Sequence, residues 1–372
     1  MIPGDIGAVI DRLLRAGAAA GEWPAAAAEL SASGTWRPVP AGTGANALSY
    51  ATSLPLSLAS LTRRPATSIA EALAGGLAIL PWVGAARLTG DGYLTITVTA
   101  EHMAGLAARV AAAGRTAANS DALAGRQLTA RVPSDPRAAA TWEQAWHARK
   151  DAVTGLLADA AGAEVDFLDS EQDLASSSPT RAGSSPAPGP ATPPSPVRDA
   201  IAFHGADAVG YALARTSAPR ADSITRQLML PLDLHNPFVL VRYAHADASS
   251  TLRWASDLGL LARTEPCRAE SWAGDLLRPE LALLNAMSWL PERVAAAARR
   301  HRPAEVAAYL EHLAGAWFDC RESCPPLPFQ GRAAPGPADA ARAVARLCLA
   351  DAARVALSCC LGLLGIGAPD RM

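Results

Sequence analysis

The C-terminal part of the chain contains the stretch NPFVLVRYAHA (residues 236–246) and ends in LGIGAPDRM (residues 364–372). Between them, apolar residues recur at helical spacing. Two stripes result: Val306, Leu310, Leu313 and Trp317, and then Val344, Cys348, Ala352, Val355 and Cys359. Proline-rich breaks at residues 325–328 and 335–337 separate the helices. The region from residue 236 onward is therefore predicted to be an antiparallel, all-helical bundle.

Both stretches resemble the all-helical anticodon-binding (DALR) domain of arginyl-tRNA synthetases, whose usual forms read NPVYYVQYAHARxxSxLR and LGIEAPERM. The match includes Leu252-Arg253 and continues to the final residue, Met372. The resemblance implies that residues 236–372 form a DALR anticodon-binding-like helical domain. It also implies tRNA, and in particular tRNA-Arg, as a partner.

The N-terminal region, residues 1–112, is predicted to be a small α/β domain. Two sets of apolar residues have helical spacing: Ile6, Val9, Ile10, Leu13 and Leu14, and then Ile69, Leu73 and Leu77. Residues 93–99, which follow Gly90-Asp91-Gly92, alternate as in a strand after a turn. Residues 104–113 are predicted to be helical.

This region resembles the N-terminal additional domain of arginyl-tRNA synthetases, which in that family contacts the D-loop of the tRNA. Residues 50–59 read YATSLPLSLA where the family has YATNxALALA, and residues 90–94 read GDGYL where it has GPGFI. Ser53 replaces the usual Asn, and Pro55 is expected to interrupt the helix that the family places there.

The region between these domains has two recognisable segments. Residues 175–197 contain seven prolines and six serines and no apolar period, which predicts a flexible linker. In residues 198–235, the stretch 203–213 (FHGADAVGYAL) resembles the GADAVRYFLL segment that leaves the family's catalytic domain. The predicted fold class is mostly α: a C-terminal helical bundle joined by a linker to a small α/β domain, the two folding separately.

Two interpretations apply to residues 113–174. The stretch AWHARKDAVTG (residues 145–155) resembles the family's HVGHxRSAVIG, which would make the region a relic of the catalytic domain. Trp146 would then replace a glycine and obstruct nucleotide binding, and only His147 would remain of the two family histidines. Alternatively, residues 141–162 are an exposed, alanine-rich helix in which His147 and Lys150 are incidental.

The catalytic motifs of the family are not intact in either interpretation. Activation of an amino acid by ATP needs fixed cations and donors around the phosphate oxygens. No two histidines lie three residues apart, and Lys150 is the only lysine, so neither the His-Ile-Gly-His-like nor the Lys-Met-Ser-Lys-Ser-like motif is present. We therefore expect no catalytic residues, no cofactor and a non-catalytic tRNA-binding protein.

Two alternatives to this function stay open. The first is an arginine–tRNA ligase that uses ATP and arginine, or a subunit that completes one in trans. The second is a protein-interaction module that has kept the fold, which would imply a protein partner.

Five residues are predicted to contact tRNA: Arg242, Tyr243, Arg253, Arg321 and Met372. The resemblance places Tyr243 and Met372 against unstacked loop bases, which proteins bind through aromatic and apolar faces. The alternatives are that Tyr243 packs in the core and that Met372 is a frayed end. Asp247 would repel a phosphate near Arg242.

Overall charge limits any nucleic-acid site to a local patch. The net charge is −2, and residues 198–372 contain 19 Arg against 11 Asp and 7 Glu, a balance of +1. The densest basic cluster, Arg293, Arg299, Arg300 and Arg302, is interpreted as a solvated helix end.

The cysteines and the apolar segments indicate a cytoplasmic protein. The six cysteines lack paired metal-ligand spacing, so no metal site is expected and the thiols are predicted to be reduced. Residues 1–15 have no apolar core typical of a signal peptide. Residues 347–366 include Asp351 and Arg354, so no membrane span is expected.

Overall fold

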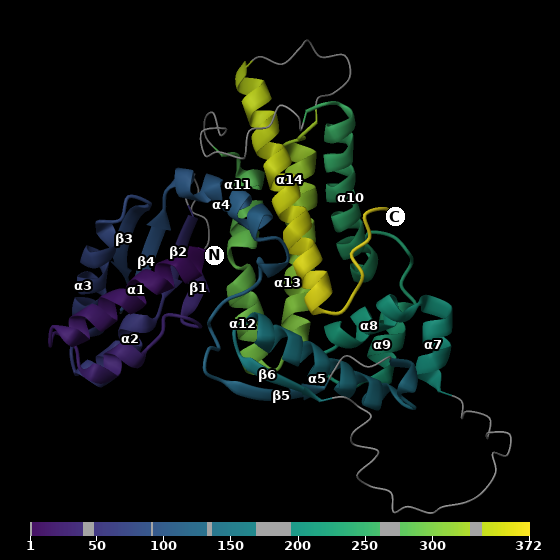
Figure 1. Cartoon of the computed structure of the whole chain (residues 1–372), viewed down its shortest axis with the longest axis horizontal. Coiled ribbons are helices and arrows are strands. Elements are labelled where there is room, and N and C mark those ends of the chain that lie inside the picture. Colours follow the sequence, from purple (N-terminus) through teal and green to yellow (C-terminus); the bar gives the residue numbers. More distant parts are fainter. Residues whose placement is uncertain are drawn as a thin grey trace, which may run out of the picture.

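The N-terminal unit is built around a four-stranded antiparallel sheet with the strand order β1-β2-β4-β3 (Figure 1). The computed structural model describes residues 2–39, 48–90, 92–131, 136–168, 195–260, 276–327 and 337–372. The helices and strands of the unit are α1 (Ile2–Ala19), a 3-10 turn at Ala25–Glu29, β1 (Trp36–Pro38), β2 (Leu48–Thr52), α2 (Leu54–Thr62), α3 (Ala66–Ala78), β3 (Val83–Thr89), β4 (Tyr93–Val98) and α4 (Ala100–Ala113).

The predicted apolar patterns of this unit are confirmed. The stripe of α1 is buried apart from the half-buried Leu13, and Ile69, Leu73 and Leu77 of α3 are all buried. Alternate residues of β4 face the core, as a half-buried strand requires. The expectation for Pro55 was wrong: it lies in the first turn of α2, where no intrahelical N–H bond is needed, so the helix starts there.

A parallel strand–helix–strand unit follows. Its elements are β5 (Gln127–Arg131), α5 (Trp142–Ala160) and β6 (Glu164–Leu168), with short 3-10 turns at Gly114–Thr116 and Pro136–Ala138. β5 and β6 pair in register from Gln127 opposite Glu164 to Arg131 opposite Leu168. A side chain at Gly155 of α5 would collide with Ala130 and Phe167, so glycine permits the close contact between helix and strands.

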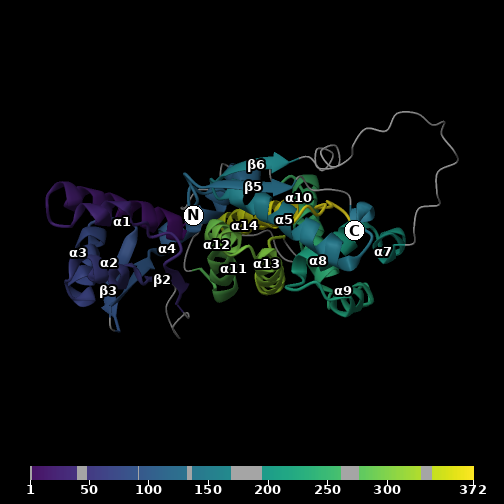
Figure 2. The same ribbon diagram turned by 90° about the horizontal axis from the view of Figure 1, so that it is seen from below.

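The remaining described residues form a helical bundle with a smaller helical layer beside it (Figures 1 and 2). Its helices are α7 (Pro196–His204), α8 (Ala206–Arg215), α9 (Ala221–Leu228), α10 (Pro237–Asp257), α11 (Arg278–Ser288), α12 (Leu290–Arg300), α13 (Pro303–Ser323) and α14 (Pro337–Leu363). Asn236 caps α10 by accepting a hydrogen bond from the N–H of Phe238 (3.1 Å). The predicted stripe Val306, Leu310, Leu313 and Trp317 is buried, and Val344 and Cys348 of the second stripe are half-buried.

The N-terminal unit packs directly on the bundle. α4 contacts α11 and α14, and the buried side chains of both parts form one continuous core. The hydroxyl of Tyr50 on β2 donates to Ser288 Oγ on α11 (3.0 Å), and Arg299 on α12 donates to Ser33 Oγ (3.1 Å). The two parts therefore meet across an apolar interface, and their separate folding stays a prediction.

The cysteines differ from the sequence prediction at one position. Cys320, Cys324, Cys359 and Cys360 are free and buried, but Cys348 is disulfide-bonded, so the prediction of six reduced thiols was wrong. Most of the predicted linker, residues 175–194, lies outside the described residues. No helix in the described part of the chain is long and apolar enough to cross a membrane.

Candidate functional site

The C-terminal tail lies along α10, where three side chains hold it. The ring nitrogen Nδ1 of His245 donates to the carbonyl oxygen of Pro369 (2.9 Å), because a carbonyl can only accept. Ser249 Oγ donates to the carboxylate of Asp370 (3.1 Å), and Arg253 Nη1 donates to its carbonyl oxygen (2.8 Å). Met372 follows with 61% of its surface exposed, so the tail is attached while its last side chain stays accessible.

Tyr243 lies on another side of α10 and is 38% exposed. Its ring stacks on Phe318 of α13, with ring centroids 5.8 Å apart and planes inclined by 21°. Eleven residues make about three turns of an α-helix, so Trp254, eleven residues beyond Tyr243, lies on the same face of α10. Trp254 is 56% exposed and is a candidate contact that the sequence reasoning missed, although its helical spacing from Tyr243 could have indicated it.

Arg321 is neutralised by an acid from the neighbouring helix. Its Nε lies 3.1 Å from Asp247 Oδ2, which also accepts a hydrogen bond from Trp317 Nε1 (3.0 Å). Burial raises the pKa of Asp247, and the opposite charge of Arg321 limits that rise. Asp247 is thus buried and paired with Arg321, and its expected repulsion of a nearby phosphate stays a prediction.

Arg242 and Arg253 are also engaged within the protein. The Arg242 guanidinium lies over the ring of Phe238, 5.1 Å from its centroid, and its buried Nε has no hydrogen-bond acceptor among the residues that the structure describes. Arg253 holds the tail through Asp370. Of the five predicted contact residues, Tyr243 and Met372 are therefore the most available to a ligand, and a direct tRNA contact by any of them stays a prediction.

The basic cluster at the C-terminal end of α12 is largely paired, as a solvated helix end would be. Arg300 and Arg302 both reach Glu305, at 3.0 and 3.6 Å, and Arg299 lies 3.9 Å from Glu292. The guanidinium of Arg293 lies over the Trp289 ring, 5.6 Å from its centroid.

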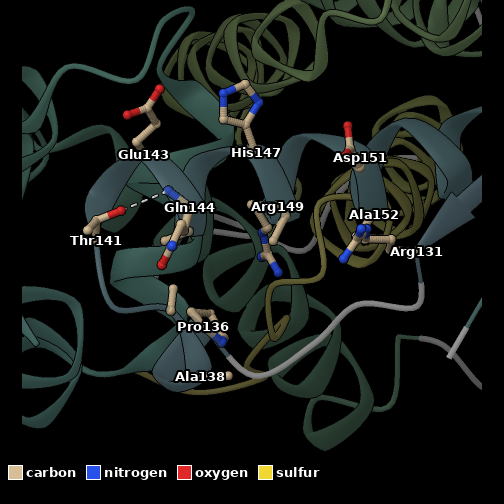
Figure 3. A pocket seen from close by; sticks show the side chains of 13 residues that line it. Arg131, Pro136, Ala138, Thr141, Glu143, Gln144, His147, Arg149, Asp151 and Ala152 are labelled. Carbon is tan, nitrogen blue, oxygen red and sulfur yellow. Dashed lines mark hydrogen bonds between the residues drawn. The ribbon is translucent and has the colours of Figure 1, made fainter. Parts of the chain in front are cut away.

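A cavity of about 720 Å³ lies beside the first half of α5 (Figure 3). Thr141 caps this helix by accepting a hydrogen bond from the N–H of Gln144 (3.2 Å). In Figure 3, His147 projects from the side of α5 opposite to Pro136, and Arg149 projects toward Pro136. Arg149 donates to the carbonyl oxygens of Leu364 (2.6 Å) and Gly365 (3.1 Å) at the end of α14, and burial lowers its pKa. The α5 cavity therefore has an arginine that is already bound to the bundle.

Trp146 does not line this cavity, and its expected obstruction of a nucleotide stays a prediction. Its side chain is buried in the same apolar cluster as Val197 and Leu213, and its Nε1 donates to the carbonyl oxygen of Thr216 (2.8 Å). The Lys150 ammonium lies over the Trp146 ring, 5.2 Å from its centroid. Trp146 thus attaches α5 to the α7–α9 layer, and His147 has no second histidine beside it in the sequence.

These contacts define a helical domain whose C-terminal tail is fixed against its first long helix and whose exposed side chains include Tyr243, Trp254 and Met372. Residues 241–372 match the model of the DALR anticodon binding domain. Over its C-terminal half the chain is homologous to arginyl-tRNA synthetases, and it contains their DALR domain. It is 38% identical over 177 residues to an arginine–tRNA ligase of Frankia alni and 34% identical over 178 residues to one of Kineococcus radiotolerans.

The fold as a whole is also similar to a solved structure. The arginyl-tRNA synthetase of Thermus thermophilus aligns over the whole of both chains with a TM-score of 0.58 at 14% sequence identity. The match to each of the two ligases covers 47% of this chain but only 30% of the ligase. The chain thus shares the fold and the DALR domain, while it matches less than a third of these relatives in sequence.

Proposed function

We propose that the chain binds tRNA, with tRNA-Arg as the first candidate, and does not aminoacylate it. The main support is the tail: three hydrogen bonds to α10 fix Pro369 and Asp370 and leave Met372 exposed. An apolar side chain that is held at the surface by hydrogen bonds to the residues before it is suited to pack on an unstacked base. Tyr243 of α10, stacked on Phe318 of α13, and the exposed Trp254 of α10 offer further aromatic surface.

The proposed binding is modest in affinity and shallow in salt dependence. The slope of affinity against salt follows the number of phosphates that cations neutralise. Arg321 is paired with Asp247, and Arg300 and Arg302 with Glu305, so these three cations are less available to phosphates. Stacking, at about 1–3 kcal/mol per base, then supplies much of the binding energy.

We expect Tyr243→Ala to weaken binding of total tRNA about 5- to 150-fold, the range that loss of about 1–3 kcal/mol of stacking gives. Filter binding at low salt, with sequencing of the retained RNA, measures this. The matched control is Phe203→Ala, which removes an aromatic ring that is 83% exposed on α7. Equal binding by Tyr243→Ala and the parent would contradict the proposal. Failure of the parent to bind tRNA would favour the protein-interaction module instead.

We expect arginine-dependent exchange of pyrophosphate into ATP to stay at background, with or without tRNA. The chain has one lysine and no pair of histidines three residues apart, and Arg149 of α5 is bound to α14. The transition state of activation would therefore lack its fixed cations. Exchange above that of a heat-denatured sample would support the ligase alternative, and exchange that needs an added protein would support a subunit acting in trans.

A further inference from the structure

The two-stranded sheet leaves one edge of β5 without a neighbouring strand among the described residues. The N–H of Glu164 donates to the carbonyl oxygen of Arg126 (2.8 Å), and the pairing is in register from there. Successive residues of a strand direct their amides to opposite sides. Leu128 and Ala130 therefore bond to β6, and the backbone N–H and C=O groups of Gln127 and Thr129 point to the open edge.

A groove runs beside this edge. Two cavities, of about 190 and 360 Å³, lie along β5 and both reach His301 at the end of α12. The floor of the smaller cavity includes Thr154 of α5, which is 6% exposed. Its hydroxyl has no hydrogen-bond partner within the described residues, which is unusual for a buried polar atom. The groove thus has an unsatisfied donor on its floor and unpaired backbone groups on its wall.

The larger cavity is basic. Arg126 and Arg299 line it with His301 and Gln127, and no acidic side chain of the described residues does. Burial lowers the pKa of Arg299, and the like charges of Arg300 and Arg126 add to that effect, while Glu292 opposes it. Arg126 is exposed and has no ion-pair partner in the part of the chain that the structure describes. The acids nearby include Glu292, 3.9 Å from Arg299, Asp151, which lines the smaller cavity, and Glu164, which accepts from Gln127 Nε2 (3.3 Å).

We propose that the open edge of β5 binds an extended, acidic segment of a protein partner, which joins the sheet as a third strand. Strand addition uses main-chain hydrogen bonds for affinity and side-chain pockets for specificity, and the groove offers both. In doubly wound sheets, with the strand order 3-2-1-4, the first strand has a neighbouring strand on each side. A third strand beside β5 would give β5 the same arrangement. The regular spacing of backbone donors and acceptors fits a peptide, whereas a nucleic acid needs a wider basic surface than this groove provides.

The test uses the full chain and a fluorescein-labelled octapeptide of alternating Val and Asp, followed by fluorescence anisotropy. We expect saturable binding, and at least tenfold weaker binding of the same peptide with Lys in place of Asp. Thr129→Pro removes the outward N–H while the bonds of Leu128 and Ala130 to β6 remain, so peptide binding should fall at least tenfold. The matched control Thr129→Ala keeps the N–H and should bind within about twofold of the parent.

Two further measurements test where the peptide binds. Arg126→Glu should weaken binding of the Asp peptide at least tenfold, while the backbone hydrogen bonds between β5 and β6 remain. In the parent, bound peptide should slow the amide hydrogen exchange of Gln127 and Thr129. Binding of tRNA should be unchanged in Thr129→Pro, so this proposal can fail while the proposed function stands. No peptide binding, equal binding by Thr129→Pro and Thr129→Ala, or Arg126-dependent binding of oligouridylate alone would each overturn it.

Discussion

Trp317→Ala is expected to lower the free energy of unfolding by about 3–5 kcal/mol, the cost of truncating a large buried aromatic side chain. Trp317 is 1% exposed in the middle of α13, so the substitution leaves a cavity between α13 and α10. It also removes the hydrogen bond from Nε1 to Asp247 Oδ2 (3.0 Å), leaving a buried carboxylate with Arg321 alone. Urea unfolding followed by circular dichroism measures the change.

The matched control for this prediction is Trp254→Ala on α10. Trp254 is 56% exposed, and a surface substitution of this kind changes stability by about 0.5 kcal/mol or less. Trp317→Phe should cost less than the alanine variant, because it keeps most of the buried ring area and loses only the N–H donor. A Trp317→Ala protein within about 1 kcal/mol of the parent would show that α13 does not pack on α10 in this way.

Local spacing predicted the elements of this fold because burial follows the period of the helix or strand. The stripe from Val306 to Trp317 is buried on α13, and the alternation in residues 93–98 gives β4. The same reasoning could not place Pro55, since a proline within an apolar run can either end a helix or begin one. The structure shows that it begins one.

The candidate site was predictable only in part, because partners distant in sequence decide how available a side chain is. Arg253 and Arg321 have the charge that phosphate contacts need, but their partners, Asp370 and Asp247, are separated from them by 117 and 74 residues. The burial of Trp146 likewise depends on a distant partner, Thr216, which lies 70 residues away in the sequence. No pattern within one helix contains such pairings.

The contact between the N-terminal unit and the bundle is the other feature that no local pattern indicates, and Tyr50 tests it. Tyr50 is fully buried, and its ring lies 5.5 Å from that of Trp289, inclined by 44°. Its hydroxyl donates to Ser288 Oγ (3.0 Å), which in turn donates to the carbonyl oxygen of Asn285 (2.7 Å). Burial raises the pKa of Tyr50, so the hydroxyl stays a donor across the ordinary pH range.

We expect Tyr50→Ala to lower the free energy of unfolding by about 3–5 kcal/mol and to increase amide exchange in α11 as well as in the sheet, because one core spans both. Tyr50→Phe keeps the ring and should cost only about 1 kcal/mol, the value of one hydrogen bond. Phe203→Ala, at an 83% exposed position, is the control that should leave both regions unchanged. If the N-terminal unit folds by itself, Tyr50→Ala will instead destabilise the sheet alone, and exchange in α11 will match the parent. If exchange increases in both α11 and the sheet, the N-terminal unit and the bundle form a single rigid body. A ligand bound to α10 and one bound to the N-terminal unit would then be held at a fixed separation.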